Sequence, residues 1–184
     1  MNLNQGESRE LKHLYTKLNA LYKEKAKIEV LKKNRENTLK EEIASVCEIK
    51  NKQGEIQANK VKMPLVCAIL DELYKELPNK EPIKADTMQS YKKAIVSKEV
   101  NEECIKGYVQ TQISLKENAE NIKEVYKESS LLPKEILDAL SAFLKDEYKL
   151  LLNDELAKQG YEVKEDKDKG ELLELKEIIR DLVK

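Results

Sequence analysis

Apolar residues recur at spacings of three, four and seven over most of the chain, which is the pattern of amphipathic helices. The first stripe consists of Leu11, Leu14, Leu18, Leu21, Ile28 and Leu31, followed by Leu39, Ile43 and Val46. Neither proline nor glycine occurs between Glu7 and Gln53. The pattern therefore predicts one helix of about 40 residues that starts near Glu7 or Ser8 and makes a rod about 60 Å long.

A second helix is predicted after the loop at 51–60. Gly54 lies in this loop and suits the end of the preceding helix. Apolar residues continue at helical spacing over 63–77, and Pro64 is well placed in a first turn. The stretch PNKEPIK, residues 78–84, is the clearest linker, and 87–96 is expected to form a short helix with Asp86 as its N-cap.

Two further helices are predicted to meet at a sharp corner. Asn101 marks the start of the first, because a capping residue precedes two acidic residues there. This helix ends at Ser129, and the next begins near Pro133. Leu131 and Leu132 are expected to pin the corner to the core.

The end of the chain predicts a last helix. Residues 160–170 form a charged loop bounded by two glycines, and 171–184 carry leucine and isoleucine on one helical face. A helix of this length is only marginally stable alone, so it is expected to dock on another element.

These elements predict an all-α fold of tandem antiparallel helical hairpins, with a long coiled-coil-like N-terminal helix and a C-terminal docking helix. The expected ranges are 1–77 for an N-terminal hairpin, 78–100 for a linker with a short helix, 101–157 for a second hairpin, and 158–184 for the charged loop and last helix.

The two hairpins share an apolar pattern. Ile43, Val46 and Cys47 match Ile122, Val125 and Tyr126 at an offset of 79. Leu65, Val66, Ile69 and Leu73 match Ile136, Leu137, Leu140 and Leu144 at an offset of 71. The repetition indicates either a duplicated hairpin or the chance similarity of amphipathic helices.

Composition narrows the class of protein. No stretch approaches the roughly 18 apolar residues of a membrane span, and the N-terminus carries no apolar segment typical of a signal peptide. The three widely spaced cysteines, Cys47, Cys67 and Cys104, suit reduced thiols, so we expect a cytoplasmic protein with cysteines as small buried hydrophobes.

Catalytic signatures are absent from the sequence. His13 is the single histidine and lies in a lysine-rich helix, where a solvent-facing or packing role is favoured over acid–base chemistry. The chain has no glycine-rich phosphate loop, HExxH or CxxC motif. We therefore expect neither an enzyme nor a metal site, cofactor or small-molecule substrate.

Charge is distributed unevenly along the chain. Residues 1–84 carry 17 Lys and Arg against 13 Asp and Glu, a net charge of +4, whereas 85–184 carry 17 against 22, a net charge of −5. The candidate phosphate-binding residues are Lys23, Lys27, Lys32, Lys33, Arg35, Lys50, Lys52, Lys60 and Lys62. These cations either contact a nucleic-acid backbone or only solvate the polar face of the helices.

A resemblance favours the first of these alternatives. The stretch LKENAENIKEVYKESSLLPKEILDALSAFLKDEYK, residues 115–149, resembles the small double-stranded-DNA-binding proteins of T-even-type phages and the GapR-like helical nucleoid proteins. The resemblance implies a phage-encoded homodimer in the host cytoplasm that clamps duplex DNA with lysines. The alternative is a helical adaptor or inhibitor that binds a host or phage protein.

Overall fold

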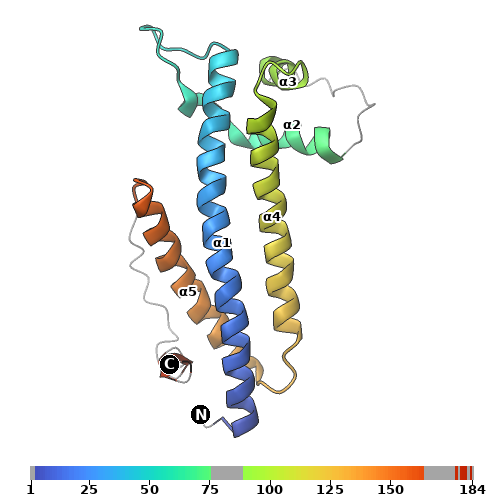
Figure 1. Cartoon of the computed structure of the whole chain (residues 1–184), viewed down its shortest axis with the longest axis vertical. Coiled ribbons are helices and arrows are strands. Elements are labelled where there is room, and N and C mark those ends of the chain that lie inside the picture. The colour runs from blue at the N-terminus through green and yellow to red at the C-terminus, as the bar shows by residue number, and fades with distance from the viewer. Residues whose placement is uncertain (1–2, 76–88, 164–176, 178, 182, 184) are drawn as a thin grey trace. The chain divides into compact units, whose positions relative to one another are not determined.

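The computed structural model describes residues 3–75, 89–163, 177, 179–181 and 183, and it is all-α, as predicted. The helices are α1 (Gln5–Val46), α2 (Met63–Lys75), α3 (Gln89–Val96), α4 (Glu102–Lys127) and α5 (Lys134–Lys158), and a short 3₁₀ turn spans Ala58–Lys60 (Figure 1). No helix in these residues is long and apolar enough to cross a bilayer. The linker at 78–84 and the capping residue Asp86 lie outside the described residues.

The 42 residues of α1 confirm the predicted long helix. A capping box starts it: the Glu7 N–H donates to the Asn4 side chain (2.8 Å), and the Asn4 N–H donates to the Glu7 carboxylate (2.9 Å). The helix ends at Val46, where the Ile49 N–H bonds the Ala44 carbonyl (2.8 Å) and Glu48 adopts φ 53°. This Schellman motif uses no glycine, so the assignment of Gly54 to the helix end is wrong.

Three further predicted helix starts are confirmed, whereas those at 87 and 171 lie outside the described residues. The Asn101 side chain accepts the Glu103 N–H (3.0 Å) at the start of α4, Pro64 lies in the first turn of α2, and Pro133 immediately precedes α5. α4 ends at Lys127, two residues before the predicted Ser129.

Contacts between residues group the chain into two compact units rather than by sequence order. The first unit combines 1–30 with 113–184, and the second consists of 31–112. Each of the long helices α1 and α4 contributes one segment to each unit. The four ranges expected from the sequence follow hairpins in chain order and do not anticipate this sharing.

In the first unit, α1 and α5 supply most of the core, and α4 runs antiparallel to α1. Asn118 of α4 donates to the Leu21 carbonyl (3.0 Å), and Glu128, the residue that follows α4, pairs with Lys17 (2.8 Å). The buried core consists of Leu11, Leu14, Leu18, Tyr22, Leu132, Ile136, Ala139, Leu140, Phe143, Leu144 and Ile179. Ile179 is 1% exposed, so this residue of the predicted last helix does dock.

A carboxylate of α1 holds the corner between α4 and α5 in the first unit. Leu132 is buried as predicted, but Leu131 is 62% exposed, so its expected place in the core is wrong. Instead, the N–H groups of Ser130 and Leu131 both donate to the Glu10 carboxylate, each at 3.0 Å. Two successive N–H groups form a concavity that suits an anion, which explains the carboxylate at this position.

Glu10→Gln is expected to lower the free energy of unfolding by about 1 kcal/mol, because an amide keeps one acceptor oxygen and loses the charge that strengthens both bonds. Urea unfolding followed by circular dichroism measures the change. Glu24→Gln, at an exposed position of the same helix, is the control. Equal stability of the two variants would contradict a role for Glu10 at the corner.

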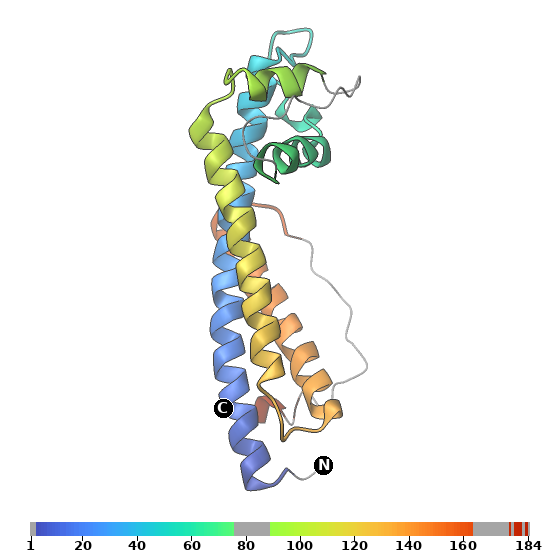
Figure 2. The same cartoon turned by 90° about the vertical axis from the view of Figure 1, so that its right-hand side faces the viewer.

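In the second unit, α2 crosses the segments of α1 and α4 steeply (Figures 1 and 2). The guanidinium of Arg35 donates to the Gly107 carbonyl (2.8 Å), which joins α1 to α4. The buried core consists of Leu39, Ile43, Ala44, Val61, Met63, Val66, Ile69, Leu70, Ala94, Ile95, Val100, Ile105 and Tyr108.

The shared apolar pattern returns in the structure with a different register. Val66, Ile69 and Leu70 of α2 are at most 5% exposed, and so are Ile136, Ala139 and Leu140 of α5, which gives an offset of 70. An offset of 71 would instead pair Leu73, 38% exposed, with Leu144, 1% exposed. The buried faces of α2 and α5 therefore align at an offset of 70, so the predicted offset of 71 is wrong by one residue.

Candidate nucleic-acid interface

Residues 47–62, called the lysine loop below, connect α1 to α2 through a tight turn. The Gly54 N–H bonds the Asn51 carbonyl (3.0 Å), and the Asn51 side-chain oxygen accepts the N–H groups of Gln53 (3.0 Å) and Glu55 (2.9 Å). Asn51 therefore satisfies the backbone of the turn in the way typical of this residue. Gly54 has φ 82°, a conformation that glycine adopts without steric cost.

Beyond the turn, the two arms of the loop pair once. Lys50 and Ile56 form an isolated antiparallel bridge, flanked by bonds from the Asn51 N–H to the Glu55 carbonyl (3.0 Å) and from the Gln57 N–H to the Ile49 carbonyl (2.8 Å). The following 3₁₀ turn leads to Val61 and Met63, which are buried in the core of the second unit. The loop is thus an ordered projection anchored at both ends.

Four lysines project from this loop. Lys50, Lys52, Lys60 and Lys62 are all exposed, and none forms an ion pair within the described part of the chain. The two acidic residues of the loop are Glu48 and Glu55, and the Glu55 carboxylate accepts the Asn51 amide N–H (2.7 Å). The loop therefore carries a net charge of +2 and offers four ammonium groups to solvent.

Lysines elsewhere in the described residues are more often paired. Lys106, Lys123, Lys127 and Lys158 lie 2.9–3.2 Å from Glu102, Glu120, Glu124 and Glu155, one helical turn away. Exposed pairs of this kind add little stability, but each carboxylate lowers the local positive potential. The α4–α5 corner follows two such pairs, and Lys134 at the start of α5 is the exposed lysine there that forms no ion pair within the described residues.

The remaining predicted phosphate-binding residues lie on α1. Lys23 and Lys27 are exposed one turn apart in the first unit, whereas Lys32 and Lys33 are half-buried in the second. Arg35 is also half-buried, and its side chain packs on Gly107, where an added Cβ would lie 3.4 Å from the guanidinium Nε. The structure therefore gives Arg35 a packing contact in addition to its charge.

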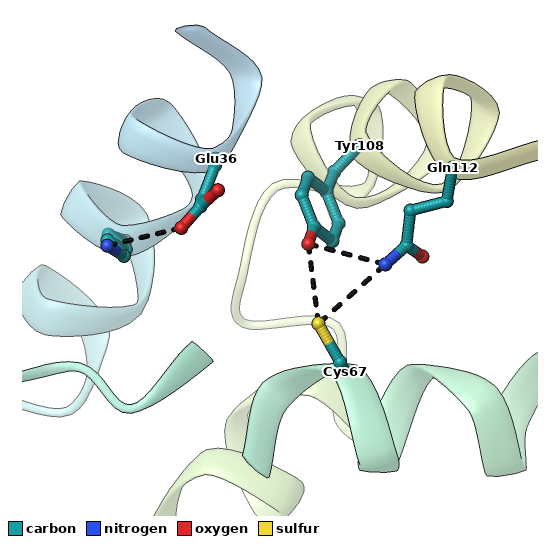
Figure 3. A network of polar contacts seen from close by, with 5 residues as sticks. Glu36, Cys67, Tyr108 and Gln112 are labelled. Atoms are coloured by element: carbon teal, nitrogen blue, oxygen red, sulfur yellow. Dashed lines mark hydrogen bonds and ion pairs between the residues drawn. The ribbon is translucent and has the colours of Figure 1, made fainter. Parts of the chain in front are cut away.

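A polar network in the second unit joins α2 to α4 (Figure 3). The Cys67 sulfur lies 3.3 Å from the Tyr108 hydroxyl, and the Gln112 amide reaches that hydroxyl (3.3 Å) and the sulfur (3.7 Å). Burial raises the pKa of Tyr108, and the contact with Cys67 and the charge of Glu36 raise it further. Tyr108 is therefore a neutral hydroxyl at physiological pH, and the network acts as a polar tie between helices.

Aromatic rings form a second cluster, in the first unit. The rings of Tyr22 and Tyr148 lie 5.6 Å apart, and the Lys25 ammonium lies 4.7 Å from the Tyr148 ring centroid. This cation–π contact occupies Lys25 within the protein. Burial raises the pKa of Tyr22 to about 12, with a further contribution from Tyr126, and burial also raises the pKa of Tyr148.

Thiol and acidic side chains form no cluster suited to a metal ion in the residues that the structure describes. Cys47, Cys67 and Cys104 are free and half-buried. Burial raises the pKa of Cys47 and of Cys104, which favours the thiol over the reactive thiolate.

Comparisons of the chain with protein-family models, with curated proteins and with solved structures find no match. The surface chemistry of the chain itself is therefore what bears on its function. On that surface, the lysine loop combines unpaired positive charge with a fixed backbone.

Proposed function

We propose that the chain is a non-enzymatic protein that binds double-stranded DNA through the lysine loop without reading its sequence. The observation that carries the proposal is the group of four exposed lysines without an ion pair in the described residues. Duplex DNA carries one negative charge per roughly 1.7 Å of its axis, and its neutralisation by lysine releases condensed counterions. The ordered backbone of the loop supports the proposal, because it limits the conformational entropy lost on binding.

The chemistry of the loop favours the phosphate backbone over bases. Residues 47–62 contain no aromatic side chain, whereas proteins that bind single strands stack bases on aromatic rings. The Asn51 side chain, which could read a base edge, is used within the turn. These features suit contacts with duplex phosphates that are independent of sequence.

Fluorescence anisotropy with a labelled random-sequence duplex tests the proposal. We expect binding at low salt that weakens steeply as salt is added, and similar affinity for unrelated duplexes. Absence of binding at low salt would refute the proposal.

A second candidate function is a helical adaptor that binds a protein. It is favoured by two exposed leucines of the first unit, Leu131 (62% exposed) and Leu150 (67% exposed). Exposed apolar residues of this size suit a partner helix or a second copy of the chain. Because Ile179 is buried in the core of the first unit, deleting 171–184 would disturb the fold, so surface substitutions are the better test.

Light scattering of the wild type and of a Leu131→Ser, Leu150→Ser variant separates these roles. A wild-type dimer that becomes a monomer in the variant would assign the leucines to self-association. A wild-type monomer would remove the homodimeric clamp that the resemblance implies. Loss of a co-purifying protein in the variant, with DNA affinity unchanged, would favour the adaptor.

A further inference from the structure

Ile56 is the one large apolar side chain in the lysine loop that its own unit leaves uncovered. It is 48% exposed, whereas Ile49 and Ala58, on either side of the bridge, pack against the core of the second unit. Ile56 belongs to neither core cluster. An exposed β-branched residue held in an ordered loop is available to a partner that accepts an apolar group.

The bridge specifies which side chains accompany Ile56. Hydrogen bonds flank the Lys50–Ile56 pair, from Asn51 to Glu55 and from Gln57 to Ile49, and none joins the pair directly. In an antiparallel ladder, the side chains of such a pair lie on the same face and approach more closely than those of a hydrogen-bonded pair. The Lys50 ammonium therefore projects on the same face as the Ile56 side chain.

The ordered backbone of the loop holds the Lys50–Ile56 pair in a fixed position, unlike an exposed apolar side chain on a flexible segment. Asn51 and Gly54 hold the turn, and Val61 and Met63 anchor the returning arm in the core. The χ1 angle of isoleucine is itself restricted by branching at Cβ. An apolar side chain presented in this way loses little conformational freedom when it enters a binding site.

We propose that Ile56 inserts as a wedge between base pairs in the minor groove of duplex DNA while the lysines of the loop hold the flanking phosphates. This inference rests on the DNA-binding function proposed above and adds a deformation to it. Architectural proteins kink duplexes by placing an apolar side chain into a base step, at a cost in unstacking that the wider contact surface offsets. Charge complementarity selects DNA as the occupant, because the loop that presents Ile56 also carries four exposed lysines, and one of them, Lys50, lies on the same face of the bridge.

The test measures bending and affinity separately on the full chain. Fluorescence transfer between dyes at the two ends of a random-sequence duplex reports bending, and anisotropy with the same duplex reports affinity. Wild type is expected to raise the transfer efficiency. Ile56→Ser is expected to abolish that rise while keeping affinity within about tenfold and the salt slope unchanged, because isoleucine releases no counterions. Ile56→Leu should bend the duplex, and Ile113→Ser, at an isoleucine of α4 that is 44% exposed, should behave as wild type.

Each other outcome overturns a defined part of the proposal. Binding without bending by the wild type, or equal bending by Ile56→Ser with its fold intact by circular dichroism, refutes the wedge and leaves DNA binding standing. No binding to DNA at low salt refutes both. A last outcome is that the wild type binds anionic phospholipid vesicles, Ile56→Ser does not bind them, and neither protein bends DNA. This result would assign Ile56 to a lipid surface and overturn the wedge.

Discussion

The variant that replaces Lys50, Lys52, Lys60 and Lys62 by glutamine is expected to lose most of the salt dependence of DNA binding. Each lysine that neutralises one phosphate contributes about 0.9 to the slope of log affinity against log salt, so four contribute about 3.6. For the wild type, a contribution of this size weakens binding by about a hundredfold between roughly 50 and 200 mM salt. The variant should therefore bind far more weakly at low salt and respond little to added salt.

A matched variant controls for net charge. Lys106, Lys123, Lys127 and Lys158 are also exposed, but each pairs with a glutamate one helical turn away. Their replacement by glutamine changes the net charge by the same amount and should leave the slope near that of the wild type. Equal slopes for the wild type and both variants would exclude the lysine loop as the interface. Lys23 and Lys27, which are exposed on α1, would then be the next candidates. Substitutions at exposed positions usually change stability by less than about 0.5 kcal/mol, so we expect all three proteins to be folded when their salt slopes are compared.

Helices were the most predictable part of this fold because their signals are local. The apolar period and residues such as Asn101, Pro64 and Pro133 specify helices and their starts without reference to distant contacts. The end of α1 was less predictable, because Glu48 takes the left-handed conformation that glycine usually supplies. Gly54, the more obvious signal, serves the turn that follows.

The grouping of helices could not be predicted from the same signals. Periodicity shows which face of a helix is buried but not which helix covers it, so hairpins in chain order were the natural expectation. The long helices α1 and α4 instead contribute to both compact units. Asn118 illustrates the difficulty: it is 2% exposed and bonds the Leu21 carbonyl, whereas a polar residue on a helix suggests a solvated face.

The candidate interface was predictable in its location but not in its composition. Lysine density identifies the loop in the sequence, whereas the lack of ion pairs at these lysines is seen only in the described structure. The packing of Arg35 on Gly107 depends on a contact 72 residues away, so its charge alone suggested only a solvated or phosphate-binding role. Nothing in the sequence marks Ile56, because the exposure of a single isoleucine in a polar stretch depends on packing that the sequence does not show.

The stability of the first unit is expected to fall steeply in alkaline solution because of Tyr22. Burial raises the pKa of this phenol from 10.0 to about 12, so the folded chain holds the phenolic proton more tightly than the unfolded chain does. The resulting stabilisation is complete below about pH 10, where both states are protonated, and it is lost as the pH rises from about 10 through 12. A shift of two pKa units corresponds to roughly 2–3 kcal/mol.

Tyr22→Phe isolates this effect, because phenylalanine keeps the ring beside Tyr148 and cannot ionise. Urea unfolding at about pH 8 and about pH 11 gives the loss of stability for each protein. We expect the wild type to lose more than the variant, by about 1.4 kcal/mol, because about half of the two-unit shift has been titrated at pH 11 and lysine titration is common to both. Burial also raises the pKa of Tyr148 and of Tyr108, so part of the alkaline loss should persist in the variant. Equal losses in the two proteins would show that Tyr22 reaches solvent readily, and the tyrosine cluster would then be open rather than part of the packed core.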